Sequence, residues 1–506
     1  MSASFHVENF GCRAARADGE AVSDRLRAAG LCEQKPSVAD VVVVNTCSVT
    51  AEADRAARAF IRRAHRLNPE ARIVVTGCFA QRAPEELAGL GGVAAVVGNS
   101  HKALAPEIIL GLARGQDGDG PTESAGLAGP ALVRADSLLS GGSSAPIWAD
   151  DRFAHSFLEG AQVEPGAQTR PNLKIQEGCG NRCTFCVIPQ TRGSSRSLPA
   201  ASVLRQVEGF VAAGGNELVL SGINLGRWGR DFSGTFSGGT IATSWLPTLS
   251  AEKRAKNGVP NSDETSSPDS APRTLSELVR QIFERTALAR LRLSSIEPMD
   301  WDAELIGLMA EYGGTRLARH AHLPLQSGSD AVLRRMHRRY RPWHYVEKVE
   351  ALGRAAGPEL TLGADVMTGF PGETDAEFRE TLELVRALPF GYLHLFPFSP
   401  RPGTPGWALH AERPVPAEAV EERMAALRAL AAEKSEAHRR RYVGRELEAI
   451  TLHTPAEVGE RGRTAALTEN FLPAEIGGNL PANRLVRVRI TGLNAAGTLE
   501  AAEAAA

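Results

Sequence analysis

Short apolar runs alternate with helical patterns through the first part of the chain. The β-branched runs at 41–44 and 73–75 have the composition of strands that are buried on both faces. Between them, 51–70 has apolar residues at helical spacing, and a third strand-like run covers 94–99. A strand–helix repeat of this kind predicts a parallel α/β domain over residues 1–115.

Further strand candidates, separated by helical patterns, lie within 169–400. Strand–helix repetition of this length predicts a parallel sheet that curls into a full or partial barrel. Two stretches rich in Gly, Ser, Pro and Ala interrupt the pattern, and we interpret 116–168 as a linker and 232–272 as a surface insertion. The candidate strands are 173–176, 217–222, 291–296, 321–326, 361–370 and 392–398.

The last part of the chain changes character twice. A helical connection is expected over 401–440, where a long Ala-, Glu- and Arg-rich pattern begins at Glu418. Residues 441–506 contain strand patterns that predict a small β-barrel. The predicted fold class is therefore α/β, with an N-terminal parallel α/β domain, a central (β/α) barrel and a small C-terminal β-barrel.

Composition narrows the function classes. The formal net charge of −2 gives no case for nucleic-acid binding by the molecule as a whole, so an RNA surface must come from local basic patches. The apolar runs are too short to cross a bilayer and the N-terminus lacks a signal-peptide pattern, so we expect a cytoplasmic protein with no membrane partner. Seven cysteines without an export signal favour metal or catalytic thiols over disulfides.

The strongest chemical signal is Cys179-x3-Cys183-x2-Cys186, directly after a strand candidate. Three closely spaced thiolates in a glycine-containing loop can hold one face of an iron–sulfur cluster. With three protein ligands, one iron of a [4Fe–4S] cluster stays open for the amino and carboxylate groups of S-adenosylmethionine. The alternatives are structural thiols or a zinc site without its fourth ligand, and no histidine lies at finger spacing nearby.

A second cysteine set is spread over the first domain. Cys12, Cys47 and Cys78 each end a strand-like segment, and the carboxyl ends of parallel strands share one edge of a sheet. Three thiols at that edge could converge on a second cluster. The spacing alone leaves a structural reading open, because cysteines at strand ends are often small buried hydrophobes. We expect Cys32, which follows a helical pattern, to be a partly buried free thiol.

Several of these segments resemble one known family. GCGNRCTFC resembles the CxxxCxxC signature of the radical S-adenosylmethionine superfamily, and FGCR, VVNTCSVTAEADR and VVTGCFAQ resemble its methylthiotransferase family. The segments RLSSIEP, HLPLQSGSD, DVMTGFPGET and FPFSPRPGTPG are most similar to those of the branch that acts on N6-threonylcarbamoyladenosine in tRNA. The resemblance covers most of the chain apart from the linker and the insertion.

The resemblance implies both a fold and a reaction. The central domain would be a partial (β/α) barrel of the radical S-adenosylmethionine type, between an N-terminal methylthiotransferase domain and a C-terminal TRAM-like RNA-binding barrel. The reaction would add a 2-methylthio group to carbon 2 of N6-threonylcarbamoyladenosine at position 37, next to the anticodon. The implied cofactors are S-adenosylmethionine and two [4Fe–4S] clusters, one catalytic and one auxiliary, held by Cys179, Cys183 and Cys186 and by Cys12, Cys47 and Cys78.

The implied partners are the tRNA anticodon stem-loop, a reducing electron donor of the flavodoxin or ferredoxin type, and a sulfur source. Two alternatives share the chemistry and differ in substrate: N6-isopentenyladenosine in tRNA, and an aspartate of a ribosomal protein. A non-catalytic iron–sulfur RNA-binding protein is an alternative of a different class.

Five further residues lie at the carboxyl ends of strand candidates, where barrel enzymes place ligand contacts. We predict that Gly222 and Asn224 meet the methionine end of S-adenosylmethionine, and that Ser294, Glu297 and Asp365 face its ribose. The alternative for each is a polar residue that orders a loop.

Two basic segments predict RNA contacts. One is a helical stripe of arginines, and the other, 334–345, interleaves cations with aromatic rings that can stack on unpaired bases. A solvated helix face is the alternative for both. The stripe consists of Arg55, Arg58, Arg62 and Arg66, and the rings of the second segment are Tyr340, Trp343 and Tyr345.

Overall fold

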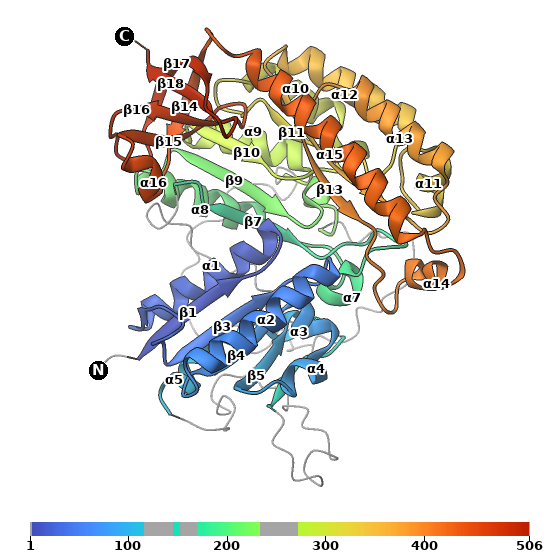
Figure 1. Cartoon of the computed structure of the whole chain (residues 1–506). Coiled ribbons are helices and arrows are strands. Elements are labelled where there is room, and N and C mark those ends of the chain that lie inside the picture. The colour runs from blue at the N-terminus through green and yellow to red at the C-terminus, as the bar shows by residue number, and fades with distance from the viewer. Residues whose placement is uncertain (1–2, 116–144, 152, 154–168, 233–271, 505–506) are drawn as a thin grey trace, which may run out of the picture.

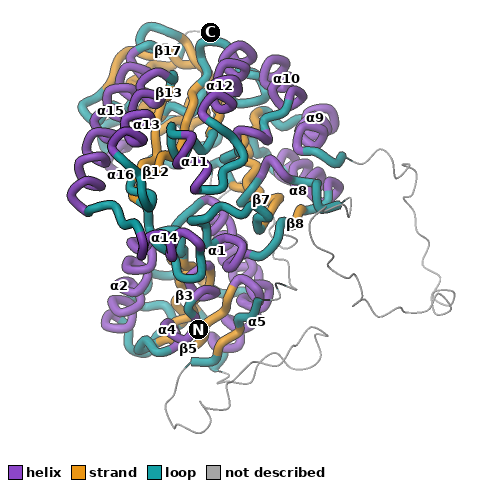
Figure 2. Tube along the Cα trace, turned by 90° about the vertical axis from the view of Figure 1, so that its right-hand side faces the viewer, coloured by secondary structure: helices purple, strands orange, loops and turns teal. Residues whose placement is uncertain are grey.

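The computed structural model has an N-terminal α/β domain, a curved central sheet flanked by helices, and a closed β-barrel (Figure 1). The N-terminal domain and the closed barrel lie at opposite ends of the central part in two views at right angles (Figures 1 and 2). Most of the predicted linker and insertion lies outside the described residues, which are 3–115, 145–151, 153, 169–232 and 272–504.

Parallel strands in the order β2-β1-β3-β4-β5-β6 form the N-terminal sheet. Asn9 pairs with Asn45 and Thr46 with Gly77, so β1, β3 and β4 end at one edge. The edge strand β6 lies within the segment predicted as a linker. The strands are β1 Ser4–Asn9, β2 Cys32–Glu33, β3 Val41–Thr46, β4 Arg72–Gly77, β5 Val93–Gly98 and β6 Ile147–Trp148.

Helices cover both faces of this sheet. On one face α1 and α5 pack against Val41 and Val43, and on the other α2 and α4 pack against Val42 and Val44, so β3 is apolar throughout. The Thr50 side chain caps α2 by accepting from the Ala53 N–H. The helices are α1 Arg13–Ala28, α2 Ala51–Leu67, α3 Cys78–Arg82, α4 Pro84–Ala88, the 3₁₀ helix η1 Asn99–Leu104 and α5 Ala105–Ala113.

The central strands form two sheets, β10-β9-β7-β8 and β11-β12-β13. A bridge between Leu291 and Leu317 and a 3.0 Å hydrogen bond from the Ile296 N–H to the His322 carbonyl join them into one open barrel wall. The strands are β7 Asn172–Glu177, β8 Arg196–Ser197, β9 Glu217–Gly222, β10 Arg290–Leu293, β11 His320–His322, β12 Thr361–Thr368 and β13 Phe390–Pro397.

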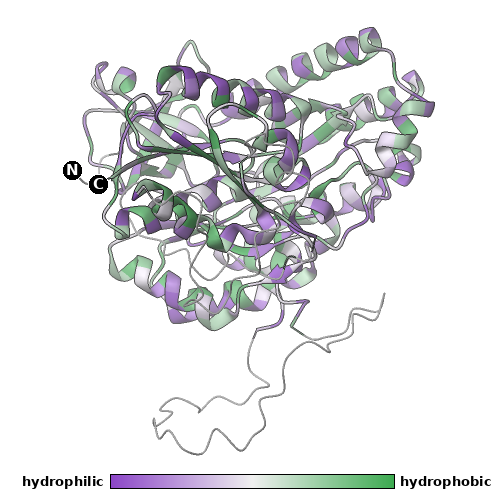
Figure 3. Ribbon diagram, turned by 90° about the horizontal axis from the view of Figure 1, so that it is seen from below, coloured by the Kyte–Doolittle hydropathy of each residue, from purple (hydrophilic) through white to green (hydrophobic). Residues whose placement is uncertain are grey.

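Alternation along these strands separates an apolar outer face from a polar inner face. Ala364 on β12 packs into the helix-covered core, whereas its neighbour Asp365 contacts polar side chains of β11 and β13. Green and purple residues accordingly alternate along the outer helices (Figure 3). These are α8 Ala200–Ala212, α9 Leu275–Arg285, α10 Ala303–Tyr312, α11 Asp330–Arg335, α12 Pro342–Ala356, α13 Asp375–Ala387 and α15 Ala417–Arg440, with α7 Ile188–Arg192, η4 Leu225–Arg227, η7 Pro298–Asp300 and α14 Pro405–Glu412 in the loops.

The C-terminal strands close into a barrel in the order β14-β15-β16-β18-β17. This barrel packs on the amino ends of the central strands, where Arg292 of β10 donates to the Thr468 and Glu469 carbonyls and Asn216 donates to the Asn483 carbonyl. Its elements are β14 Glu446–Thr451, α16 Ala456–Gly459, β15 Arg463–Thr468, β16 Pro473–Gly477, β17 Leu485–Leu493 and β18 Leu499–Glu503.

The structure confirms the predicted fold class: parallel α/β sheets, an open barrel wall and a small closed C-terminal barrel. Within the described part of the chain, no helix combines the length and the apolar character needed to cross a membrane.

Candidate active site with two cysteine sets

The loop after β7 holds the first cysteine set around a cavity of about 840 Å³, a size typical of sites for small molecules. The chain turns into this loop at Gly178, whose φ is +71° and where a Cβ would collide with the Ser194 carbonyl oxygen, so only glycine fits. The cavity lining includes Cys179, Cys183, Cys186, Asn181, Gln190, Ser194 and Thr404.

Nitrogen donors surround the sulfur atoms of this set. The Asn181 N–H and Asn224 Nδ2 lie 3.4 and 3.6 Å from Cys179 Sγ, and Arg338 Nη1 lies 3.4 Å from Cys183 Sγ. Burial raises the pKa of Cys186 to about 12, so a free thiol there would keep its proton at neutral pH. Three thiols in one loop, with nitrogen donors around two of the sulfur atoms, fit a metal cluster, because a cluster binds thiolates and displaces their protons.

Two of the predicted S-adenosylmethionine contacts carry orphaned polar atoms. Asn224 Oδ1 and Ser294 Oγ are buried, and neither has a hydrogen-bond partner among the described residues. The Ser294 N–H donates to the Leu220 carbonyl at 3.0 Å. Ser294 therefore follows the carboxyl end of β10 beside the carboxyl end of β9, which Asn224 follows. Since buried polar atoms are nearly always hydrogen-bonded, these two fit a bound polar ligand.

Gly222, a third predicted contact, ends β9 close to Gln176. A Cβ on Gly222 would lie 2.9 Å from the Gln176 Cβ, so the missing side chain lets β7 and β9 approach each other. Gln176 accepts from the Asn224 N–H at 2.7 Å and donates to the Gly178 carbonyl at 2.8 Å. It thereby fixes the cysteine loop against the end of β9. A contact of Gly222 with S-adenosylmethionine stays a prediction.

Glu297, the fourth predicted contact, reaches the cysteine loop through Arg338. The Arg338 side chain is 4% exposed, and its Nη2 donates to Glu297 at 2.6 Å while its Nη1 contacts Cys183. Burial alone would lower the pKa of Arg338, but the adjacent Tyr340 and Glu297 raise it well above its ordinary value. A permanent cation therefore lies beside the sulfur of Cys183.

This position of Arg338 corrects part of the prediction that 334–345 contacts RNA, whereas Arg334 and Arg339 are exposed and their contact with RNA stays a prediction. Tyr340 and Tyr345 are fully buried, and their hydroxyls donate to the Leu325 and Leu323 carbonyls at 2.7 and 2.9 Å. Among the three rings only Trp343 is exposed. The segment passes under the cysteine loop, and the rings of Tyr340 and Tyr345 belong to the core.

Asp365, the fifth predicted contact, lies on the wall formed by β11, β12 and β13. Its carboxylate is 3.4 Å from His322 Nε2 and 3.2 Å from His394 Nδ1. Burial alone would raise the pKa of Asp365, but the hydrogen bonds from both imidazoles hold it well below its usual range. An ionised carboxylate therefore faces the interior of the open barrel, and its contact with a ribose stays a prediction.

The second cysteine set meets at the edge where β1, β3 and β4 end. Cys12 directly precedes α1, Cys47 follows β3, and Cys78 is the first residue of α3. Gly11 has a φ of +102°, and a Cβ there would lie 2.5 Å from Cys47 Sγ. The structure thus brings together three cysteines that lie far apart in the sequence.

Electrostatics supports a shared ligand for this set. Burial raises the pKa of Cys47 to about 12, and negative charge on Cys12 and Cys78 acts in the same direction. Three thiolates at one edge of the sheet repel one another unless a cation lies between them, which fits an iron–sulfur cluster. Cys32 is exposed on β2, so the expectation that it is partly buried is wrong: its strand lies at the sheet edge.

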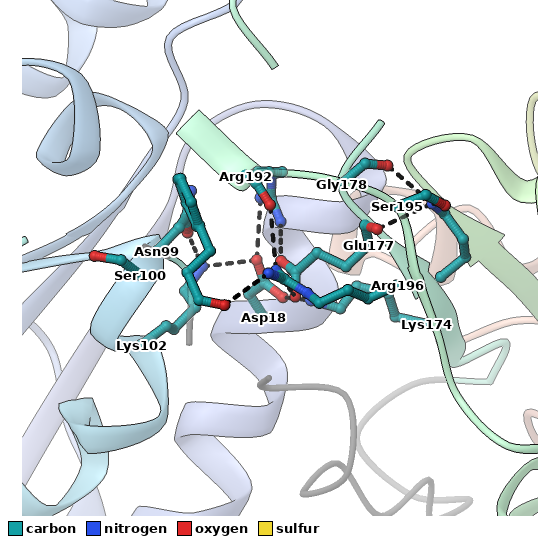
Figure 4. A network of polar contacts seen from close by, with 12 residues as sticks. Asp18, Asn99, Ser100, Lys102, Lys174, Glu177, Gly178, Arg192, Ser195 and Arg196 are labelled. Carbon is teal, nitrogen blue, oxygen red and sulfur yellow. Dashed lines mark hydrogen bonds and ion pairs between the residues drawn. The ribbon is translucent and has the colours of Figure 1, made fainter. Parts of the chain in front are cut away.

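A buried polar network joins the N-terminal domain to the central sheet (Figure 4). Asp18 of α1 contacts Lys102 at 2.6 Å, Arg192 at 3.1 Å, and also Lys174 of β7. Arg192 donates to Glu177 at 2.8 Å. Burial alone would raise the pKa of Asp18, but the surrounding cations hold it far below its usual range.

Sequence reasoning missed Gln176, Asp18 and Arg192 as site residues and misassigned Arg338. The only available signal was position: Gln176 precedes the first cysteine set and Arg192 follows it closely. Each of the four also has a partner that is distant in the sequence: Asn224 for Gln176, Lys174 for Asp18, Asp18 for Arg192, and Cys183 for Arg338.

The predicted arginine stripe lies on α2. Arg55, Arg62 and Arg66 are exposed, whereas Arg58 is partly buried and pairs with Glu86 at 2.7 Å. Three exposed arginines at helical spacing therefore lie on one helix, and their contact with RNA stays a prediction.

Comparisons with known proteins match both parts of this site. Residues 4–98 match the family described as "Uncharacterized protein family UPF0004", and residues 173–385 match the "Radical SAM superfamily". Each matched region contains one complete cysteine set. The structure of TsrM from Kitasatospora setae, a radical S-adenosylmethionine methyltransferase, has a TM-score of 0.52 and 15% identity over 81% of this chain and 78% of its own, which shows a shared fold.

Two relatives span nearly the whole chain. The threonylcarbamoyladenosine tRNA methylthiotransferase MtaB of Bacillus subtilis is 31% identical, over 96% of this chain and 93% of its own. The tRNA-2-methylthio-N(6)-dimethylallyladenosine synthase of Cereibacter sphaeroides is also 31% identical, over 96% of this chain and 95% of its own. The chain belongs to the methylthiotransferase family of radical S-adenosylmethionine enzymes.

Proposed function

We propose that this protein adds a 2-methylthio group to carbon 2 of N6-threonylcarbamoyladenosine at position 37 of tRNA. The observation that carries the proposal is the presence of two cysteine sets in adjoining domains, linked by buried hydrogen bonds and ion pairs. Relatives named for this substrate in Bacillus subtilis and Aquifex aeolicus cover 96% of the chain. The cofactors of the family are [4Fe–4S] clusters and S-adenosylmethionine.

The two sets would hold different clusters, Cys179, Cys183 and Cys186 the one that binds S-adenosylmethionine and Cys12, Cys47 and Cys78 the auxiliary one. When bound, these groups supply the radical that removes hydrogen from the base and the sulfur and methyl that replace it. The chain positions them: Gln176 fixes the first loop, and Gly11 lets the second set close around Cys47.

Residues around the first set would orient S-adenosylmethionine. Asn224 Oδ1 and Ser294 Oγ offer acceptors at the ends of β9 and β10, and Asp365 offers an ionised carboxylate from β12. All three lie at carboxyl ends or on the inner face of the strands, where the helices exclude water from behind. The target base would lie between the polar inner face of this wall and the N-terminal domain.

The RNA itself would contact α2 and the C-terminal barrel, which we propose is a TRAM-like RNA-binding domain. Exposed Arg487 and Arg489 lie on one face of β17, and Arg55, Arg62 and Arg66 line α2. A tRNA substrate places the reaction in the cytoplasm. Reductive chemistry also requires an electron donor of the flavodoxin or ferredoxin type, and the transferred sulfur requires a source.

One alternative substrate has support of its own. The Cereibacter sphaeroides relative is named for dimethylallyladenosine and is as similar as the Bacillus subtilis protein. Both substrates share the reacting carbon 2 and differ in the group on N6.

Mass spectrometry of tRNA nucleosides from a deletion strain separates these substrates. The proposal expects loss of 2-methylthio-N6-threonylcarbamoyladenosine, accumulation of the unthiolated nucleoside, and restoration by the wild-type gene. Selective loss of the methylthio derivative of N6-isopentenyladenosine would instead assign the alternative, and unchanged tRNA would contradict both.

A further inference from the structure

The charges of the buried network that joins the N-terminal domain to the central sheet do not balance (Figure 4). With each group in its usual ionised form, two carboxylates face three cations, a formal charge of +1, although burial lowers the pKa of Lys102. Arg196 adds a further cation 3.7 Å from Glu177. Buried charge is stable only when it is compensated, so the excess requires a negative partner. The five buried residues are Asp18, Glu177, Lys102, Lys174 and Arg192.

Arg192 connects this excess to the second cysteine set. It ends α7, and the carbonyl of the preceding Thr191 accepts from Asn99 Nδ2 at 2.8 Å. The same Nδ2 lies 3.4 Å from Cys78 Sγ. Arg192 is fully buried, yet its Nε has no hydrogen-bond acceptor among the described residues. A buried guanidinium donor without an acceptor marks room for an anionic group.

The electrostatic surroundings of Arg192 agree with an anionic group at the second cysteine set. Burial alone would lower the pKa of Arg192, but negative charge at Cys78, Asp18, Glu177 and Cys12 raises it well above its ordinary value. Three thiolates around a [4Fe–4S]²⁺ core carry about one net negative charge, which is opposite in sign to the excess of the network.

We infer that Arg192 is a positioning residue whose buried guanidinium offsets the negative charge of the auxiliary cluster and raises the reduction potential of that cluster. The inference rests on the proposed ligand set of Cys12, Cys47 and Cys78. One-electron reduction adds a negative charge to the cluster, and a desolvated cation nearby stabilises the reduced form more than the oxidised form. No proton transfer is involved.

Redox titration followed by electron paramagnetic resonance tests the inference. The full-length chain with Cys179, Cys183 and Cys186 replaced by alanine leaves the auxiliary cluster as the only signal. Arg192→Gln removes the cation, Arg192→Lys keeps it, and the double variant Arg192→Gln/Asp18→Asn removes one charge of each sign, which protects the fold. The matched control is Arg423→Gln, which removes a buried arginine of α15 that pairs with Glu373.

The inference expects at least a tenfold shift of the reduction equilibrium toward the oxidised cluster in Arg192→Gln, about 59 mV for one electron. The double variant, which loses the adjacent carboxylate as well, should shift less. Arg192→Lys and Arg423→Gln should stay near the parent value. If Arg192→Gln loads iron and keeps the parent potential, the proposed role of Arg192 is wrong, while the proposed ligand set is unaffected. A parent chain that binds no cluster at all would overturn the ligand set, and with it both this inference and the proposed division of tasks.

Discussion

The side-chain amide of Asn99 donates a 2.8 Å hydrogen bond to the carbonyl oxygen of Thr191, and so ties the N-terminal domain to α7 of the central domain. Its Nδ2 also lies 3.4 Å from Cys78 Sγ. Thr191 follows the first cysteine set closely in the sequence, so a single side chain links the surroundings of both sets. A second connection, from Arg401 to Asp54 at 2.6 Å, joins the same domains at α2.

Because Gly11 makes room for Cys47, we predict that Gly11→Ala loses the auxiliary cluster. Wild-type protein reconstituted without oxygen should hold about eight irons per chain, from two four-iron clusters. Gly11→Ala should hold about four, because the new Cβ would collide with the Cys47 side chain. Iron analysis together with a protein assay measures the ratio.

Gly30→Ala is the control for this variant. Gly30 also has a positive φ, +88°, but a Cβ there would have no atom within 4 Å. Its variant should keep the full iron content even if the turn is strained. Equal iron in both variants would show that Cys47 tolerates a displaced neighbour, and would remove the steric argument.

The arginines on α2 predict salt-dependent RNA binding. Replacing Arg55, Arg62 and Arg66 together by alanine should flatten the plot of log affinity against log salt by about two to three, roughly one for each lost phosphate contact. A tRNA binding assay at several salt concentrations gives the slope. A triple variant of the exposed Arg280, Arg285 and Arg354, on α9 and α12 away from α2 in Figure 1, is the control. If both variants keep the wild-type slope, the RNA surface lies elsewhere.

Buried His438 predicts a loss of stability in mild acid. Burial lowers its pKa to about 4, and the charges of Arg441 and Arg439 act in the same direction. The unfolded chain, with an ordinary pKa near 6.5, binds more protons between these values, so stability falls as the pH drops through this window. From pH 7 to pH 5.5 this residue should cost about 1 kcal/mol.

Urea unfolding of the wild type and of His438→Gln at both pH values isolates the effect. His438 Nε2 lies 2.9 Å from the Thr361 hydroxyl, and glutamine keeps a hydrogen-bonding group there. The difference in unfolding free energy between the two proteins should change with pH. Parallel pH profiles would mean that His438 titrates normally in the folded state.

Local patterns were sufficient to predict the main elements of the fold. The apolar run at 41–44 has the composition of a strand buried on both faces, and β3 is covered by helices on both sides. The spacing of Cys179, Cys183 and Cys186 in one loop needed no long-range information. The edge strand β6 was missed because two residues pairing with β5 leave no pattern of their own.

Contacts across long sequence separations explain what could not be predicted. Arg338 lies in a segment rich in arginine and aromatic residues, a composition that also suits an RNA surface. Its actual partners, Cys183 and Glu297, come from two other loops. Similarly, the sequence pattern places Asp18 on the polar face of an amphipathic helix, whereas in the structure it is buried between Lys174 and Lys102. Composition records none of these pairings.

We propose that the two cysteine sets have separate tasks. Radical generation needs only the cluster at Cys179, Cys183 and Cys186, whereas sulfur transfer also needs the cluster in the N-terminal domain. The two sets lie in different domains with separate cores, so each should be removable while the other domain stays folded.

The most direct measurement follows 5′-deoxyadenosine and the 2-methylthio nucleoside together in Cys183→Ala and Cys47→Ala, with circular dichroism as the check on folding. Cys183→Ala should form neither product. Cys47→Ala should still cleave S-adenosylmethionine to 5′-deoxyadenosine and should transfer no methylthio group to tRNA. A well-folded Cys47→Ala protein that methylthiolates tRNA at the wild-type rate would contradict the account.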